Sequence, residues 1–359
     1  MKEKINSLQL SSIFALLIFS SSIGISLYTT IKIAGIDSYI SVFIGGILGI
    51  IPLLLVLYIF NYDIDKPIYE KNKIIFGNFL GNIINFIISI LYLVVAITIL
   101  FNTSNFIVSQ YLSDTPLLLI MIIFMLVILH AVNKGIECIS RVSAIFVIIT
   151  LFFFLFGICG TISEVKIDNL KPFLEFGLEK PIIGGFVNTL MSTAPIYTIL
   201  IIPKKDICDN EKTAKYLIIS YMIASITLFL ISFVANAVLG KYLTGLYQFP
   251  GYIALKRISL FGFIDRIENF LSLQWILSAF VTLSMIIYYL IKNIKKNGNS
   301  KILNIIVGSI IIFLSYKSFR NNTAFNSYLY NYYPYILSLL TVMYFVISIS
   351  IFIKKKLKK

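Results

Sequence analysis

The sequence predicts an all-α polytopic membrane protein of about ten transmembrane helices, arranged as a five-plus-five inverted repeat with broken helices 1 and 6. Of its 359 residues, 58% are hydrophobic and only 13% are charged, whereas soluble domains carry about 25% charged residues. The apolar residues fall in windows of about 20, the length that spans a bilayer core. Polar or helix-breaking residues interrupt the first and the sixth window at corresponding places.

The windows form a single transmembrane domain over residues 1–359, with repeat one at about 9–162 and repeat two at about 183–353. The connections carry the turn and charge signals, and none is long enough for a separate soluble domain. The ten predicted spans are 9–30, 38–60, 80–102, 116–133, 142–162, 183–202, 216–239, 269–291, 302–318 and 334–353.

The first span is broken halfway across the hydrocarbon. Its central stretch, LLIFSSSIGISLYTT, contains Ser20, Ser21, Ser22, Ile23 and Gly24. Glycine tolerates backbone angles that other residues do not. Backbone groups freed by such a break are costly in lipid unless they are buried in protein or line a polar cavity.

The sixth span, GGFVNTLMSTAPIYTILIIP, is broken at Ser192, Thr193, Ala194 and Pro195. Proline cannot donate a backbone hydrogen bond and disfavours helical geometry at the preceding residue. Paired breaks of this kind form midplane binding sites in inverted-repeat transporters. Half-helix N-termini suit a carboxylate, while freed carbonyls and hydroxyls suit an ammonium group or a cation. Close helix packing is the alternative for each break, and their symmetric placement favours a binding site.

The formal charge of +14 is concentrated between the spans and in the tail KKKLKK, which indicates membrane anchoring and not nucleic-acid binding. With both termini on one side, that side holds 20 of the 30 Lys and Arg residues. The positive-inside rule therefore predicts cytoplasmic termini. The loop 241–268 then faces outward as short amphipathic helices, which either seal the bundle at the interface or serve as a gate or docking surface.

The predicted span interiors contain no Asp, Glu, Lys or Arg, and His130 and Lys32 lie at span ends. Proton-coupled carriers usually bury a titratable relay residue, so a proton relay is not predicted, while a sodium ion held by carbonyls and hydroxyls stays open. The three cysteines share no metal or redox spacing. No cofactor, metal ligand or catalytic cluster is predicted, and a membrane enzyme has little support.

Four stretches resemble the B subunit of nutrient germinant receptors, the spore germination protein family. They are IKIAGIDSYISVFIGGILG (31–49), DTPLLLI (114–120) with NKGIECISR (133–141), IDNLKPFLEFGLEKPIIGG (167–185) and FPGYIALKRISLFGFIDRIENFLSLQWI (249–276). The last is the most specific, with matches at Pro250, Ile258, Ser259, Phe263, Asp265, Arg266, Glu268 and Trp275. The resemblance extends to about residue 292. It departs at the sixth-span break, where the family commonly has Ser-Phe-Pro-Phe-Gly-Glu and this chain has proline displaced by one and Tyr197 in place of the acid.

The resemblance implies membership of the amino acid–polyamine–organocation superfamily, with a LeuT-like fold. It implies a protein of the spore inner membrane that binds a small nutrient, often an amino acid, and acts with an A subunit and a lipoprotein C subunit to trigger germination. The ligand would lie between spans one, three, six and eight. Ser20 to Gly24 and Ser192 to Pro195 would form its cradle, and Tyr197 would add a wall or a hydroxyl.

Depth along spans three and eight adds four more candidates, for each of which packing is the alternative. They are Tyr92, Thr98, Gln274 and Ser278. The leading function is thus a sensor subunit that uses a transporter-like fold, and secondary amino-acid transport is the alternative. A sensor needs only a ligand that prefers one conformer.

Overall fold

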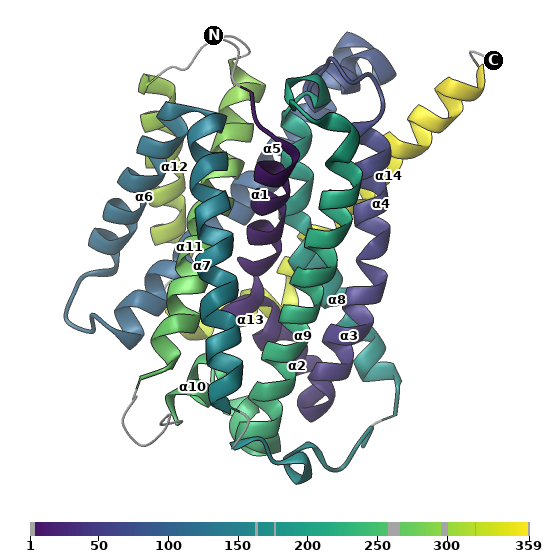
Figure 1. The fold of residues 1–359 in the computed structure, drawn as a ribbon. Helices are drawn as coiled ribbons and strands as arrows, with labels where there is room; N and C mark the ends of the chain where they lie inside the picture. Colours follow the sequence, from purple (N-terminus) through teal and green to yellow (C-terminus); the bar gives the residue numbers. More distant parts are fainter. Residues whose placement is uncertain are drawn as a thin grey trace.

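The helices of the computed structural model lie side by side in one bundle, with both chain ends at the same end of it (Figure 1). We call this the terminal end and the opposite one the distal end. The structure describes residues 4–161, 164–175, 177–257, 266–295, 301–319 and 321–357, apart from the side chains of residues 22 and 23. No strand occurs in these ranges beyond an isolated bridge between Ile5 and Ile207.

The first repeat holds the helices that build the predicted spans one to five. α1 and α2 form the first span and are separated by a π-helical turn. α3 and α4 form the second, and α5 is bent at Gly77, just before the predicted third span. The elements are α1 Ser7–Phe19, the π turn Ser22–Ser26, α2 Leu27–Ala34, α3 Ser38–Leu48, α4 Ile50–Phe60, α5 Ile68–Gln110, α6 Leu117–Lys134 and α7 Ile136–Thr161.

The second repeat begins with α8, which continues as a 3-10 helix at the predicted break of span six. α9 contains span seven and bends at Gly240, and the short helices α10 and α13 lie outside the predicted spans. The elements are α8 Glu179–Thr193, the 3-10 helix Ala194–Ile201, α9 Thr213–Leu246, α10 Pro250–Lys256, α11 Glu268–Ile294, α12 Lys301–Ser318, α13 Asn322–Asn331 and α14 Tyr333–Leu357.

Within the described residues, nine helical stretches are long and apolar enough to cross a membrane. The first of them, Ser7–Phe60, has 54 residues. At about 1.5 Å per residue this is far longer than one crossing requires, and it contains predicted spans one and two. The stretches therefore account for all ten predicted spans. The prediction of two breaks is confirmed, although each is a change of helix type and not an extended gap.

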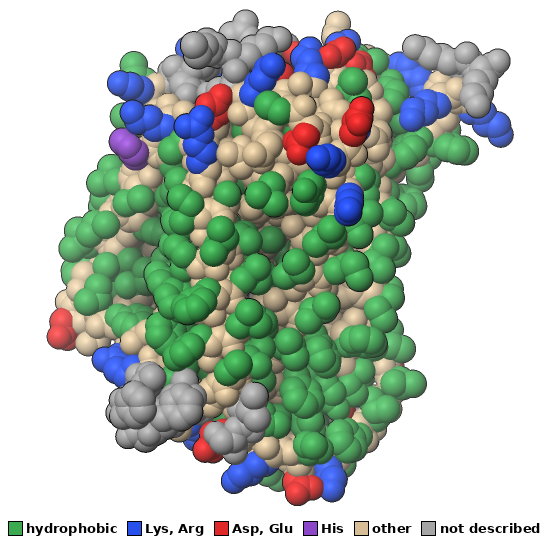
Figure 2. Space-filling view, viewed as in Figure 1, with side chains coloured by type: hydrophobic (Ala, Val, Ile, Leu, Met, Phe, Trp, Pro, Cys, Tyr) green, Lys and Arg blue, Asp and Glu red, His purple; other side chains and the backbone are tan. Residues whose placement is uncertain are grey.

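On the face seen in Figure 2, apolar side chains form a broad belt across the middle of the molecule, while charged side chains collect at its two ends. The helices differ in how many of their side chains are buried. Most of α1 is buried, as are the 3-10 helix after α8 and most of α11. Many side chains of α6, α12 and α14 are exposed. The two broken spans thus lie inside the bundle, where their backbone is shielded from lipid.

Contacts between loops agree with the predicted division of the chain between two sides. At the terminal end, Lys204 donates to Asn61 and Lys205 pairs with Asp65 at 3.2 Å, which joins two loops predicted on the same side. At the distal end, other loops meet each other. The Asp37 carboxylate accepts from the Leu174 N–H at 3.1 Å, and Lys241 pairs with Glu175.

Candidate functional site

The break in the first span is a tight turn whose hydroxyls satisfy their own helix. The hydroxyls of Ser20 and Ser21 donate to carbonyls one turn earlier, at 2.8 and 3.2 Å. The Ser26 N–H reaches back five residues to the Ser21 carbonyl at 2.8 Å, which closes the π turn. Gly24 has φ of +72°, in the left-handed region that favours glycine. Two further predicted site residues, Ser22 and Ile23, have side chains outside the described set.

The carbonyl of Ser20 is held by a side chain from another span. The Trp275 indole N–H, on α11, donates to it at 2.8 Å. Trp275 is 1% exposed and is the only tryptophan in the chain. Because a discontinuous helix leaves carbonyls without their usual partners, this bond stabilises the break and couples it to span eight.

Residues from two distant parts of the chain approach Gly24. A Cβ on residue 24 would lie 2.5 Å from the Phe249 ring and 3.0 Å from Oδ1 of Asn102. Asn102 comes from α5 and Phe249 immediately precedes α10. The absence of a side chain at Gly24 therefore allows a carboxamide and an aromatic ring to lie directly against the broken backbone. We call Gly24, Asn102, Phe249 and Trp275 the break chamber.

Aromatic rings cover the distal side of the break chamber. The Phe106 ring lies 4.9 Å from those of both Phe249 and Trp275, and 5.2 Å from that of Tyr252. All three contacts are edge-to-face, the favourable geometry for aromatic pairs. Burial raises the pKa of the Tyr252 phenol, which keeps this cover uncharged. The cover separates the break from the distal end.

The sixth span packs against the first and second through small residues and hydroxyls. Ser26 donates to the Asn188 carboxamide on α8, and Thr189 donates to the Gly45 carbonyl of α3 at 2.9 Å. The predicted cradle residues Ser192 and Thr193 donate to carbonyls of their own helix, at 2.8 and 2.7 Å. Ala194 and Pro195 begin the 3-10 helix and are buried.

Tyr197 belongs to a buried tyrosine cluster on spans three, six, eight and ten. Its ring stacks on Tyr344 with centroids 4.1 Å apart. The hydroxyls of Tyr344 and Tyr92 are 3.3 Å apart, and Tyr92 meets Tyr289 edge to face at 4.8 Å. The structure thus brings together Tyr92 and Tyr197, which were predicted from different spans. Tyr289 and Tyr344 were not among the predicted residues, because only tertiary contacts link them to Tyr92 and Tyr197.

The remaining predicted residues face other parts of the bundle. Thr98 lies 3.2 Å from the Tyr328 hydroxyl of α13. Gln274 is 1% exposed and lines a small apolar cavity among α7, α9, α10 and α11, where its Oε1 has no hydrogen-bond partner among the described residues. The Ser278 hydroxyl donates to the Gln274 carbonyl at 2.8 Å.

A polar run on α5 was not predicted from the sequence. Residues 102–105, Asn-Thr-Ser-Asn, follow the apolar part of the predicted third span. Thr103 and Ser104 are fully buried, and their hydroxyls have no hydrogen-bond partner in the described structure. The run of four consecutive polar residues in an apolar helix is the sequence signal that could have identified these positions. Buried polar groups without partners are rare in proteins, so this run favours a polar ligand or water beside the chamber.

Formal charge is concentrated away from the break chamber. The described charged side chains that are buried are Asp37, Lys71 and Glu268, all outside the predicted span interiors. Among the described residues, no three His, Cys, Asp or Glu side chains come together as a metal site requires. The groups packed at the break are therefore an uncharged set of a carboxamide, a backbone carbonyl and aromatic rings.

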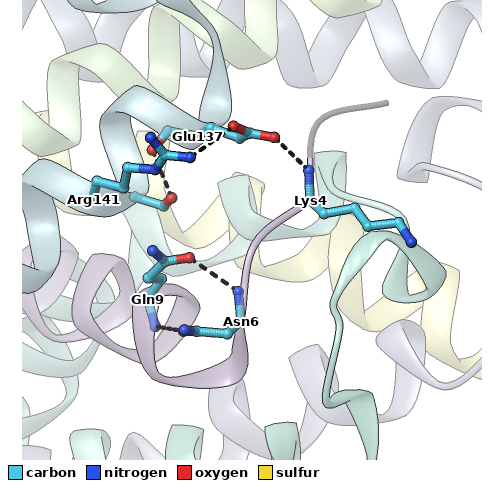
Figure 3. A network of polar contacts seen from close by, with 6 residues as sticks. Lys4, Asn6, Gln9, Glu137 and Arg141 are labelled. Carbon is cyan, nitrogen blue, oxygen red and sulfur yellow. Dashed lines mark hydrogen bonds and ion pairs between the residues drawn. The ribbon is translucent and has the colours of Figure 1, made fainter. Parts of the chain in front are cut away.

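At the terminal end, the segment before α1 is clasped between the first turns of α7 and the loop that joins α8 to α9. In Figure 3 the Lys4 N–H donates to Glu137 at 2.9 Å, and Glu137 also pairs with Arg141 at 3.1 Å. Asn6 and Gln9 cap the helix reciprocally, a capping box that satisfies its first donors. The clasp fixes where the first span begins.

The other side of the clasp is the loop between α8 and α9. The Ser7 N–H donates to the Asp209 carboxylate at 2.6 Å, and Ile5 pairs with the loop backbone beside Ile207. Partial burial acts to raise the pKa of Asp209, but the bonds from Ser7 outweigh it and the pKa is lowered. The carboxylate contact is therefore complete above the ordinary Asp range and is lost as the pH falls through the lowered pKa.

We expect Asp209→Ala to release the segment before α1. A hydrogen bond to a charged group contributes about 1.5–3 kcal/mol, and local opening governs proteolysis. Trypsin cleavage after Lys4 should therefore be severalfold faster, up to about tenfold, in the purified variant. Asp206→Ala is the matched control, because Asp206 meets Ile5 through its backbone carbonyl. Equal cleavage of both variants would show that the carboxylate does not hold the clasp.

Comparison with known proteins places the chain beside spore germination proteins. Residues 4–326 match the family model described as spore germination protein. Spore germination protein XB of Bacillus anthracis is 22% identical over 279 residues, which cover 78% of this chain and 77% of that protein. Spore germination protein KB of Bacillus subtilis (strain 168) is 25% identical over 272 residues, covering 73% and 71%.

Solved structures show the same fold at low sequence identity. Mhp1, a nucleobase-cation-symport-1 family transporter with bromovinylhydantoin bound, has a TM-score of 0.65 at 15% identity, covering 91% of this chain and 75% of Mhp1. MhsT in complex with L-phenylalanine has a TM-score of 0.62 at 14% identity, covering 96% and 89%. The predicted LeuT-like fold is confirmed.

Proposed function

Because this chain belongs to the spore germination protein family, we propose that it is the transporter-like membrane subunit of a nutrient germinant receptor. A small nutrient binds at the break chamber, and its preference for one conformer of the broken helices passes a signal to partner subunits. The observation that carries this proposal is the convergence on Gly24, where Asn102, Phe249 and Trp275 surround a broken backbone.

The chemistry of the chamber supports an amino acid as the nutrient. A carboxamide, backbone groups and aromatic faces suit a small zwitterion with an apolar side chain. A structural relative, MhsT, is solved with L-phenylalanine bound, which supports the same class of ligand here. The predicted residues Ser20 to Gly24 remain proposed contacts at this chamber, whereas Thr98 and Gln274 face other parts of the bundle.

A sensor requires no ion-coupling machinery in the span interiors. A ligand shifts a two-state equilibrium only by its differential affinity for the two states, so no buried relay charge is required. The absence of formal charge from the predicted span interiors supports sensing. Secondary amino-acid transport is the second candidate, favoured by the likeness of the fold to transporters.

Partners and placement follow from the family and from the charge distribution. We propose that the chain acts with A and C subunits in the spore inner membrane, with the terminal end in the cytoplasm. The cytoplasmic assignment rests on the excess of Lys and Arg in the loops predicted on that side. The distal end, with α10 and α13, then faces outward and receives the nutrient.

Intrinsic fluorescence tests the proposed site without labelling. The single tryptophan, Trp275, is bonded to Ser20 in the break. We expect its emission to change in a saturable way when the purified chain is titrated with amino acids that it binds. Titration across the amino acids with no saturable response from any of them would contradict amino-acid binding at the chamber.

Uptake into proteoliposomes separates the two candidate functions. The chain would be reconstituted with a labelled amino-acid panel, with and without proton and sodium gradients. Binding seen by Trp275 emission without gradient-driven accumulation is the result expected of a sensor. Accumulation that follows a gradient would make the protein a transporter.

A further inference from the structure

A polar cavity lies between α2 and α13. Its volume is about 370 Å³, within the range of small-molecule sites. Two of its lining residues come from α2 and the others from one face of α13. The residues used below are Tyr28, Lys32, Thr323, Asn326, Ser327 and Asn331.

The cavity wall on α13 has helical periodicity. Thr323, Ser327 and Asn331 are spaced by four residues and Asn326 follows Thr323 by three, so they line one side of the helix. The other side is apolar, with Phe325 and Leu329 fully buried in the core. The helix therefore presents a continuous polar face to α2.

The two walls of the cavity offer opposite halves of a zwitterion-binding site. Lys32 is the only charged residue among the described residues that line it. Its ammonium donates to the Gly245 carbonyl at 3.0 Å, which uses one of its three donors. The carboxamide oxygen Oδ1 of Asn326 is buried and has no hydrogen-bond partner among the described residues. An ammonium with free donors suits a carboxylate, and a free carbonyl oxygen suits an ammonium.

The cavity lies beyond the break along the first span. Tyr28 and Lys32 lie four and eight residues beyond Gly24 along the first span, or about 6 and 12 Å at 1.5 Å per residue. The described residues that line the cavity do not include Gly24, Asn102, Phe249 or Trp275. A ligand in the cavity would therefore be bound separately from one in the chamber.

We propose that this cavity is an outer binding site for a zwitterionic amino acid, with Lys32 taking the carboxylate and Asn326 the ammonium group. The inference rests on the proposed function, since it assigns a second site for the same class of nutrient. The outer site concentrates the nutrient beside the covered chamber and discriminates against molecules that lack either charge.

Thiol modification tests the electrostatics of the cavity and requires no identified ligand. Cys138, Cys159 and Cys208 would be replaced by serine in the full-length chain, and Ser327→Cys introduced as the reporter. We expect an anionic methanethiosulfonate to react several times faster than a cationic one of similar size. Lys32→Gln should reduce this ratio at least about threefold, because the removed charge lines the cavity.

Lys317→Gln is the matched control, since it removes the same charge from the exposed end of α12 at the same side of the molecule. It should leave the ratio unchanged. Equal rates for the two reagents, or equal effects of the two substitutions, would overturn the assignment of Lys32. If Ser327→Cys fails to fold, Asn331→Cys reports from the same wall.

Protection of the reporter thiol tests the ligand class. The probes are a mixture of the neutral L-amino acids, the same mixture as carboxamides, and the corresponding deaminated carboxylates. Only the amino acids should slow modification at millimolar concentration, and Asn326→Ala should raise the concentration for half-protection about tenfold. Protection by all three mixtures, or by none, would contradict a zwitterion site.

Protection of the reporter thiol is also measured in a chain that carries Gly24→Leu. This measurement separates the outer site from the proposed function of the chamber. Protection that persists while the Trp275 emission response is lost supports two distinct sites. Protection that disappears together with the emission response would show that the outer cavity depends on the chamber and is no separate site. An emission response without protection would leave the chamber proposal standing and overturn the outer site.

Discussion

Gly24→Leu abolishes the ligand response while leaving the protein in the membrane. Two independent costs lead to this expectation. A side chain at φ of +72° costs about 1–2 kcal/mol in backbone strain. Its Cβ would also lie 2.5 Å from the Phe249 ring and 3.0 Å from the Asn102 carboxamide, so both must move. Because this collision displaces the groups proposed to contact the ligand, we expect a loss of more than tenfold in apparent affinity, equivalent to more than about 1.4 kcal/mol.

Gly35 supplies the control for this experiment. It lies in the same region of the chain with φ of +59°, but nothing approaches a Cβ there within 4 Å. Gly35→Leu therefore carries the backbone strain without the collision. The measurement is the Trp275 emission dose response, with membrane insertion checked by fractionation. A response that survives in Gly24→Leu, or is lost equally in Gly35→Leu, would place the site elsewhere.

Trp275→Phe loosens the broken first span and weakens ligand binding. The phenyl ring preserves most of the packing against Phe106 and Phe249, but the N–H that donates to the Ser20 carbonyl is lost. Leaving a buried acceptor without its partner costs about 1–3 kcal/mol. We expect a lower apparent unfolding temperature and a binding constant weakened about fivefold to a hundredfold.

This variant contains no tryptophan, so its emission cannot report unfolding or binding. Unfolding would be measured as the loss of the monodisperse chromatography peak on heating, and binding would be measured with labelled ligand. Phe280→Leu is the control, because it shortens a buried aromatic on α11 without removing a donor. Trp275→Phe should lose more affinity than Phe280→Leu at similar stability. Equal losses of affinity would mean that the indole contributes packing and not the hydrogen bond.

The membrane class, the number of spans and the positions of both breaks were predictable from the sequence. Apolar windows of about 20 residues are required because lipid satisfies no backbone hydrogen bond. A glycine and a proline placed symmetrically in two such windows then indicate discontinuous helices. Tyr92 and Tyr197 were predicted from two different spans, and the structure places them in one cluster. These signals are local or periodic, so one sequence was enough.

The residues that contact the break lie at positions that no local sequence pattern connects. Asn102 lies on α5, Phe249 before α10 and Trp275 on α11, and their proximity to the first span depends on how the bundle packs. The outer cavity likewise arises only when α13 lies against α2. The sequence by itself thus determined a membrane bundle with two broken helices, because the bilayer constrains each span separately. Only the tertiary structure decided which side chains surround the break, because contacts between distant spans depend on packing across the whole bundle.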